Sequence, residues 1–214
     1  MKLDMHVHTL HSKKCGWMKP EGLIERAREK GLDGLAVTDH NTIDGALEVF
    51  DIVRDEQMKL SVIIGEEIST DRGEVLAYFI NKEIKEGPFS EVLAQIKRSG
   101  GISAIPHPFD RIRKGFNNVK AAMNEVDAIE VLNSRCFFNQ KAFDLCRAHN
   151  KPMLGGSDAH FYREVGQAWT EISDDPRACI LAGRTRIGGR LSNPAYLALT
   201  KGVKVWRKAT SGLV

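Results

Sequence analysis

Short apolar runs alternate with amphipathic segments along the first three quarters of the chain. Runs of strand length lie at residues 3–7, 34–38, 60–65, 75–80, 102–106, 128–132 and 153–155. Segments in which apolar residues recur at helical spacing lie at residues 20–30, 43–57, 89–99, 119–124 and 139–149. Strands that alternate with helices predict parallel β-α-β units. About seven such units favour a closed or nearly closed barrel over an open, doubly wound sheet.

The domain organisation follows from the length and from where this pattern stops. The alternation weakens after about residue 170, and 214 residues suit one compact domain. We therefore expect one domain over residues 1–214, with the residues from about 171 as its C-terminal appendage. No internal repeat or linker is visible.

The bulk composition narrows the class of protein. No window approaches 18 apolar residues, and the first methionine is followed by a lysine and a predicted strand, so we expect a cytoplasmic protein without a membrane segment. Four scattered cysteines without CxxC spacing favour neither a zinc ribbon nor a disulfide framework. The net charge is +3, which suits a phosphorylated substrate. A nucleic-acid partner is not indicated, because no basic block forms an arm, and we interpret the basic residues 201–208 as a solvated helix or tail.

Candidate chemistry lies where the predicted strands end. Histidines or acids follow five apolar runs, in the segments His6-Val7-His8, Thr38-Asp39-His40, Gly65-Glu66-Glu67, Pro106-His107-Pro108 and Ser157-Asp158-Ala159-His160. A spacing of two places His6 and His8 on one face of a strand. Imidazole and carboxylate groups gathered at one rim of a barrel indicate a metal centre.

These segments, in this order, resemble the PHP (polymerase and histidinol phosphatase) domain family of metal-dependent phosphoesterases. The resemblance covers most of residues 1–170 and implies a distorted seven-stranded (β/α) barrel with up to three metals. It implies that the first metal takes His6, His8, Glu67 and Asp158, that Glu67 bridges to a second metal with His107, and that His40 and His160 hold a third. Glu67 matches the family pattern Gly-x-Glu-x-Ser, whereas Glu66 is expected to point away as an exposed or supporting acid.

The sequence departs from the family pattern in two places. Glu74 occupies the place of a histidine ligand of the second metal, and a carboxylate there shifts preference toward manganese, magnesium or iron. Lys13 and Lys14 occupy the places of a ligand to the third metal. Cys15, one residue further, is a candidate ligand or a small buried cysteine, and His11 is expected to be exposed in the loop. Either two or three divalent ions (Zn, Mn, Fe or Mg) are therefore expected.

Several residues are predicted to support this centre. Asp39 is expected to accept the imidazole N–H of a ligating histidine. Arg135 and Arg163 are candidate phosphate-binding residues, and Lys13 and Lys14 could serve in the same way. No catalytic side chain is expected beyond a metal-activated water.

The sequence therefore predicts a metal-dependent hydrolase of a phosphomonoester or phosphodiester in a small metabolite, a nucleotide or a nucleic-acid end. The resemblance suggests histidinol phosphate or phosphorylated nucleotides without selecting among them. Two alternatives stay open. One is a non-catalytic, metal-stabilised regulatory or binding module, and the other is an amidohydrolase-type C–N hydrolase, for which no bridging lysine is evident. The oligomeric state is not indicated.

Overall fold

The computed structural model describes residues 1–113 and 115–210, in which nine strands form one sheet. The strands are β1 (Lys2–Val7), β2 (Gly34–Val37), β3 (Ser61–Thr70), β4 (Gly73–Tyr78), β5 (Ile102–Ile105), β6 (Ala128–Asn133), β7 (Met153–Gly156), β8 (Ala168–Ile172) and β9 (Thr185–Gly189). The α-helices are α1 (Pro20–Glu29), α2 (Asp44–Asp55), α3 (Phe89–Arg98), α4 (Val119–Ala122), α5 (Asn139–Ala148), α6 (Pro176–Leu181) and α7 (Ala195–Thr210). The seven predicted strands are all present.

The sheet is mixed, which corrects the expectation of uniformly parallel units. Its order is β7-β6-β5-β4-β3-β2-β1-β8-β9, and β4 runs antiparallel to both β3 and β5. The chain passes from β3 to β4 through the tight turn Asp71-Arg72, with no helix between them. A parallel neighbour would need a crossover connection of a dozen or more residues. Two additional strands extend the sheet beyond β1: β8 runs antiparallel to β1, and β9 runs antiparallel to β8.

The sheet curls until β7 lies beside β1 and β8, which gives the nearly closed barrel that the sequence predicted. The main chain of Asp158 donates to the carbonyl of His6 at 2.7 Å, and that of His8 donates to the carbonyl of Ala159 at 2.9 Å. This closure requires a glycine at position 156, since a Cβ there would lie 2.5 Å from the His6 Cβ. The closure therefore brings the first and the last predicted ligand segments together.

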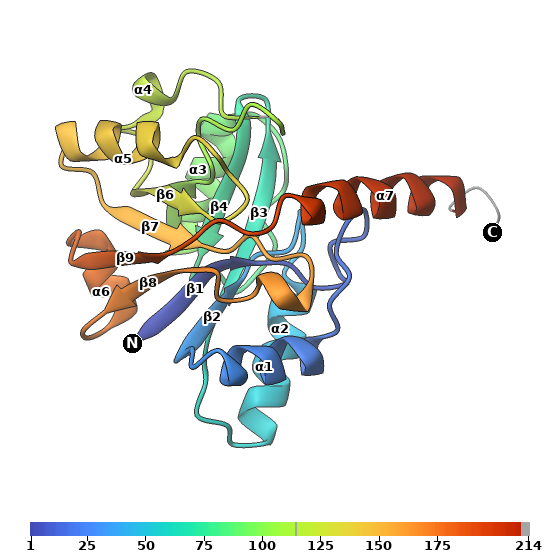
Figure 1. Ribbon diagram of the computed structural model, residues 1–214. Helices are drawn as coiled ribbons and strands as arrows, with labels where there is room; N and C mark the ends of the chain where they lie inside the picture. Colours follow the sequence, from blue (N-terminus) through green and yellow to red (C-terminus); the bar gives the residue numbers. More distant parts are fainter. Residues whose placement is uncertain (114, 211–214) are drawn as a thin grey trace.

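Three apolar clusters stabilise this arrangement. One fills the barrel with alternate strand residues, among them Leu3, Leu76 and Ile102. The second packs α1 and α2 against β1 and β2, and the third packs α3, α4 and α5 against the β4–β6 side. Figure 1 shows these two sets of helices on opposite sides of the strands.

The C-terminal helix α7 differs from the others, because it extends away from the barrel (Figure 1). Only Thr200 of this helix is buried. Among the described residues, no helix is both long and apolar enough to cross a membrane.

Candidate metal centre

All eight predicted ligands converge at one end of the barrel. Three overlapping groups place their ligand atoms within 4.8 Å of one another: His6, His8 and Asp158; His8, His40 and His160; and His40, Glu67 and Glu74. His107 joins them through its Nε2 atom, which lies 3.2 Å from Glu67 Oε1. The structure thus brings together residues that lie as many as 154 positions apart.

Two buried contacts fix the orientation of the His6 and His8 rings. Nδ1 of His6 lies 3.0 Å from a carboxylate oxygen of Glu130. An ionised carboxylate accepts hydrogen bonds and cannot donate one, so Nδ1 is the donor of this pair. Nδ1 of His8 lies 3.2 Å from the Ser12 hydroxyl, and this hydroxyl donates its proton to Asp39 at 2.6 Å. Both histidines therefore carry a proton on Nδ1, and their Nε2 atoms are left for the centre of the cluster.

The two Nε2 atoms fit a bound cation. They lie 3.1 Å apart with both rings fully buried, so two lone pairs would face each other unless a positive charge stands beside them. Burial opposes protonation of His6, but Asp158, Glu130 and Glu67 outweigh it and raise the pKa of His6 well above its usual value. A divalent ion would supply this positive charge without a proton, which is the usual role of carboxylate and imidazole groups clustered in this way.

Glu67 lies at the middle of the cluster. One of its oxygens lies 3.0 Å from His40 Nδ1, 3.4 Å from His8 Nε2 and 3.5 Å from His6 Nε2. Burial alone would raise the pKa of Glu67, but His6 and His40 hold it well below the usual value, so the carboxylate stays ionised. Its position between the histidines is the one that a bridging carboxylate needs.

The positions of Glu67 and Glu74 within strands were not expected. The sequence placed Glu67 after a strand and Glu74 before one, whereas both lie inside the antiparallel β3–β4 pair. Successive side chains of a strand point to opposite faces of the sheet, so Glu67 shares the face of Ile63 and Glu74 shares the face of Leu76. Ile63 and Leu76 both belong to the apolar cluster inside the barrel, so both acids point toward the barrel interior. Glu74 lies 3.6 Å from His40 Nδ1 and 3.8 Å from His107 Nε2.

Three residues of the site adopt a left-handed backbone that is uncommon for non-glycine residues. The φ angles are +51° at Asn41, +29° at His107 and +55° at Asp158. Such conformations persist only where the surroundings enforce them, and they collect at functional sites. His107 also has a buried Nδ1 atom without a hydrogen-bond partner among the described residues.

Two supporting acids act differently from the sequence expectation. Asp39 receives no imidazole N–H; it accepts hydrogen bonds from Thr9 and from the Ser12 hydroxyl, and reaches His8 only through Ser12. Glu66 points away from the cluster, as expected, and its complete burial rules out the exposed alternative and leaves a supporting role. It accepts from the Ile84 main chain at 2.8 Å, and burial raises its pKa to about 7.

Sequence reasoning missed Glu130 and Arg113. Glu130 accepts from the His107 main chain at 2.9 Å in addition to its contact with His6, so one acid orients two predicted ligands. Its signal in the sequence was an acid inside the apolar run of β6. Arg113 pairs with Asp158 through Nη1 and with Asp110 through Nε, at 2.6 Å for the latter. No pattern marked Arg113, because it lies in an irregular loop.

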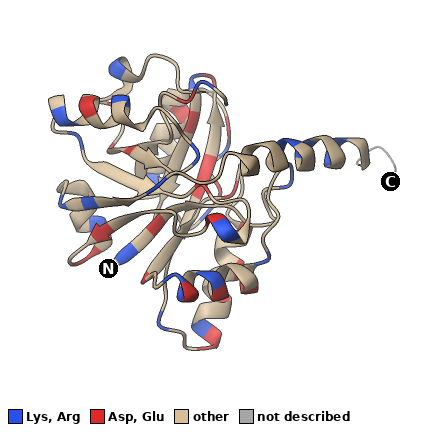
Figure 2. Cartoon of the chain, viewed as in Figure 1, with Lys and Arg blue, Asp and Glu red and all other residues tan. Residues whose placement is uncertain are grey.

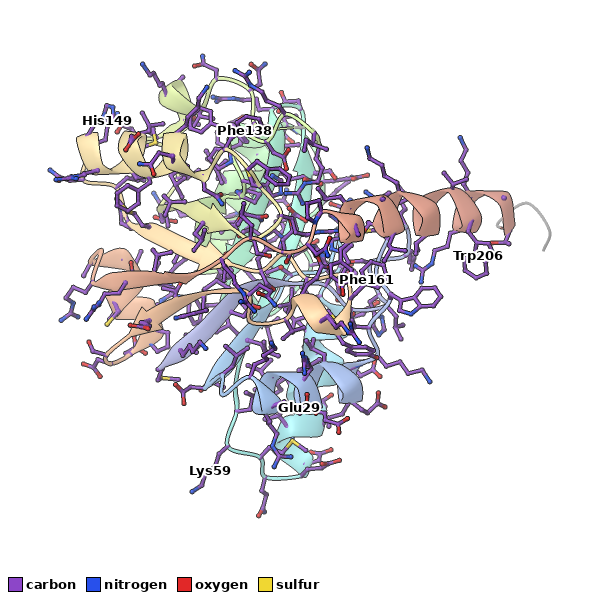
Figure 3. All side chains as sticks on the ribbon, viewed as in Figure 1. Glu29, Lys59, Phe138, His149, Phe161 and Trp206 are labelled. Carbon is purple, nitrogen blue, oxygen red and sulfur yellow. The ribbon has the colours of Figure 1, made fainter. Side chains whose placement is uncertain are left out.

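The loop after β1 contains the residues of the uncertain third site. Cys15 is buried, lies outside the three ligand groups, and burial raises the pKa of its thiol to about 12. Lys13 and Lys14 are exposed. His11 is a partly exposed loop residue that pairs with Glu48 at 2.6 Å. His149, the one histidine not considered at sequence level, is exposed beyond α5 (Figure 3).

The two candidate phosphate-binding arginines lie in different places. Arg135 is buried, with Nη1 2.8 Å from His160 Nδ1 and Nη2 bound to the Tyr196 carbonyl and the Thr200 hydroxyl of α7. Arg163 is exposed and lines two cavities that contain none of the predicted metal ligands. We therefore keep Arg135 as a residue of the site and do not retain Arg163.

Known proteins resemble this chain over most of its length. A family model described as PHP-associated matches residues 137–182. An uncharacterised protein of Methanocaldococcus jannaschii is 35% identical over 185 residues, which cover 81% of this chain and 71% of that protein. The 5′-3′ exoribonuclease Rnm of Escherichia coli is 34% identical over 94 residues, which cover 43% of this chain and 31% of that protein.

The fold also matches solved structures. A two-domain protein from Bacteroides vulgatus, described as containing a predicted PHP-like metal-dependent phosphoesterase, superposes with a TM-score of 0.72 at 20% identity. The match covers 89% of this chain and 65% of that protein. At this identity the likeness establishes the shared fold.

Proposed function

The chain belongs to the PHP domain family of metal-dependent phosphoesterases, and on this premise we propose that it hydrolyses a phosphoester of a small phosphorylated molecule. The proposed ligands are those expected from the sequence: His6, His8, His40, Glu67, Glu74, His107, Asp158 and His160. We propose two or three divalent ions in this centre. Its mixture of imidazole and carboxylate donors suits zinc, manganese or iron, and the carboxylate of Glu74 also admits magnesium.

The observation that carries the proposal is the pair of facing Nε2 atoms of His6 and His8. Their Nδ1 atoms are engaged by Glu130 and Ser12, so the rings cannot present other atoms to the centre without losing buried hydrogen bonds. Asp158 lies 3.3 Å from His8 Nε2 and completes the set. Divalent ions held here would lower the pKa of a coordinated water and neutralise charge on phosphoryl oxygens.

The chain's own residues bind and orient the substrate. A cavity of about 330 Å³ contains Glu67, His107, Asp158 and His160 together with Arg113, so a phosphate in it would face both the ligand cluster and a guanidinium. Arginine suits this task, because its planar fork donates two hydrogen bonds to phosphoryl oxygens. If Asp158 held an ion, Arg113 would still be anchored by Asp110, and its guanidinium would be available to a phosphoryl group in the same cavity.

This cavity, which we call the inner cavity, also has two apolar lining residues. Ile112 and Leu197 line it beside the polar residues. A volume of this order suits a small molecule and not a folded macromolecule. We therefore propose a small phosphorylated metabolite or nucleotide as the substrate.

The alternatives fit the site less well. An amidohydrolase of the kind considered above would carry a bridging lysine on a strand, whereas the lysines of the inner cavity, Lys201 and Lys204, both lie on α7. A non-catalytic module has no need for a cavity that opens onto the ligand cluster. The reaction is therefore better described as phosphoester hydrolysis.

The test is a metal analysis followed by a phosphatase screen. Protein purified without chelators is expected to contain at least two divalent ions per chain, and reconstituted protein is expected to hydrolyse an aryl phosphate and some phosphorylated metabolites. Less than one ion per chain in folded protein would refute the metal centre. Full metal content with turnover only of amide substrates would replace the proposal by the amidohydrolase alternative.

A further inference from the structure

A cavity outside the ligand cluster gathers basic residues from three segments of the chain. It measures about 630 Å³, and we call it the basic cavity. Its cationic lining residues come from the end of α1, from the short 3₁₀ helix Tyr162–Glu164 and from the segment after β9: Arg26, Lys30, Arg163 and Arg190. Figure 2 shows Lys and Arg positions on α1 and on the short helix beside it. None of the predicted metal ligands lines this cavity.

The lining of the basic cavity contains no acidic residue. Its other members are uncharged: Gln167, Leu191, Ser192, Asn193, Pro194 and Tyr196. The whole chain has 28 acids against 31 lysines and arginines, so this separation of charge is a local property of the cavity. Among the described residues, one carboxylate lies within 4.0 Å of these cationic groups: Glu29 pairs with Arg26 at 2.6 Å. Glu29 lines a neighbouring cavity together with Glu25.

Neutral groups hold the arginines of this cavity in place. Nε of Arg26 donates to the Tyr162 carbonyl at 3.1 Å, and Nε of Arg190 donates to the side-chain oxygen of Gln167 at 2.9 Å. The side-chain amide of Gln167 also donates to the Arg163 carbonyl at 3.2 Å, so it connects two of the basic segments. An amide or carbonyl oxygen orients a guanidinium without neutralising it. The charge of Arg190 is therefore positioned and left for a ligand.

The cations of the basic cavity act on one another. The pKa of Lys30 is lowered from its usual value, first by burial and then by the positive charges of Arg26 and Arg190. A cleft lined by charges of one sign concentrates the field and attracts ions of the opposite sign. An anion bound here would relieve this mutual repulsion.

We propose that the basic cavity is a separate binding site for a small polyphosphate anion, either inorganic triphosphate or the triphosphate group of a nucleotide. The inference does not rest on the proposed function, because none of the residues of the basic cavity lines the inner cavity. Three arginines suit phosphoryl oxygens, since each planar fork can donate two parallel hydrogen bonds. Several phosphoryl groups are needed to match four positive charges.

The surroundings of the cavity favour a compact anion over a nucleic-acid strand. The four cations face one concave volume, and a volume of this order suits a small molecule. Glu25 and Glu29 lie next to it on α1 and would repel a long phosphate backbone that continued across this helix.

The double substitution Arg163→Ala/Arg190→Ala tests the site in metal-loaded protein. The probe is inorganic triphosphate, added as its magnesium complex so that it does not remove ions from the metal centre, and binding is measured by calorimetric titration. The matched control is Lys97→Ala/Arg98→Ala, which removes the same net charge from exposed positions at the end of α3. We expect wild type and control to bind alike, and the arginine variant to bind about tenfold or more weakly. Titration with the magnesium complex of ATP distinguishes a nucleotide, which would bind more tightly than inorganic triphosphate, from the polyphosphate group alone, which would bind equally well.

The outcomes separate this inference from the proposed function. Equal binding of both probes by the arginine variant and the control, or no binding by wild type, would overturn the site. Binding of a single-stranded oligonucleotide that is lost in the arginine variant, without binding of either probe, would replace the proposal by a nucleic-acid surface. The kcat/KM for an aryl phosphate is expected to be the same in variant and control, and a loss in the variant alone would assign these arginines to the metal centre instead. Failure of the proposed function would remove this activity from every protein and leave the binding result unchanged.

Discussion

The proposed metal centre has an inner and an outer part that are built differently. The inner group of His6, His8 and Asp158 is almost completely buried, and its histidine rings are held by Glu130 and Ser12. In the outer group of His40, Glu67 and Glu74, the side chains of His40 and Glu74 are 25% and 29% exposed. The outer group includes no equivalent of the Glu130 contact among the described residues.

This difference has a consequence for metal binding. Ligands whose orientation is fixed before the ion arrives lose little freedom on binding, so the inner group is expected to hold its ion more tightly. The exposed outer group is expected to exchange its ion and to determine which metal supports activity. Glu67 contacts histidines of both groups, so metal binding by both groups is expected to depend on this carboxylate.

The largest effect is expected from Glu67→Gln, which removes the carboxylate shared by both groups. Loss of a residue that only hydrogen-bonds a metal ligand can lower activity by up to ~100-fold. Loss of the shared carboxylate is expected to lower it further. The measurement is kcat/KM of metal-reconstituted protein, with the fold checked by circular dichroism. Glu66→Gln is the matched control, because this neighbouring acid points away from the cluster. Loss of activity in the Glu66 variant alone would show that the wrong acid has been assigned.

Removal of the metal should destabilise the protein, mainly through the inner group. A ligand at 100 times its Kd stabilises the folded state by about 2.7 kcal/mol, which corresponds to roughly 5–11 °C in Tm for a chain of this size. Thermal denaturation is compared with and without a chelator, and again after the metal is restored. A Tm that does not respond to chelation would contradict the cation position inferred from the facing Nε2 atoms.

Glu130→Gln tests how the inner group is positioned. The amide keeps the size of the side chain but removes the charge that holds His6, so metal affinity is expected to fall by about 10–100-fold. Competition with a chelating dye measures this affinity apart from activity. Glu125→Gln, an acid that pairs with Arg72 at the surface, is the control. An unchanged metal affinity would mean that the imidazole ring of His6 is held by packing alone.

Glu74→His tests the outer group and is expected to change the preferred metal more than the maximal rate. An imidazole in place of a carboxylate should move activity from manganese or magnesium toward zinc. The ratio of activities with zinc and with manganese is measured for wild type, for this variant, and for Glu86→His as a control at an exposed acid. The same ratio in all three proteins would remove Glu74 from the ligand set.

Cys15→Ser is expected to have the smallest effect. Burial raises the pKa of this thiol to about 12, so it is neutral at physiological pH and alkylation of the native protein should be slow. Metal content and activity are compared with those of Cys179→Ser, which alters a cysteine of the barrel core. Loss of one ion per chain in the Cys15 variant alone would show that sulfur binds the third metal.

Much of the centre could be predicted because its residues are marked locally. His6 and His8 are spaced by the period of a strand, and His107 and Asp158 each follow an apolar run. Glu130 and Arg113 could not be assigned in this way. Glu130 contacts a histidine 124 positions away, and only the curling of the sheet brings the two together.

The C-terminal residues show the same limit more clearly. Their basic composition predicted a solvated helix, and α7 is indeed a largely exposed helix. The first part of α7 lines the inner cavity, and Arg135 holds it there by donating to the Tyr196 carbonyl and the Thr200 hydroxyl. Carbonyl groups are present at every position, so no sequence pattern could identify these partners.

The sequence by itself determined the order of strands and helices as far as β7, the barrel, and the residue types gathered at its rim, because the strand period and apolar runs are local properties. The antiparallel β4, the protonated nitrogen of each inner histidine and the gathering of four basic residues at one cavity were decided only by the tertiary structure. These features depend on which groups meet after the barrel closes, and on hydrogen bonds that must be satisfied once water is excluded.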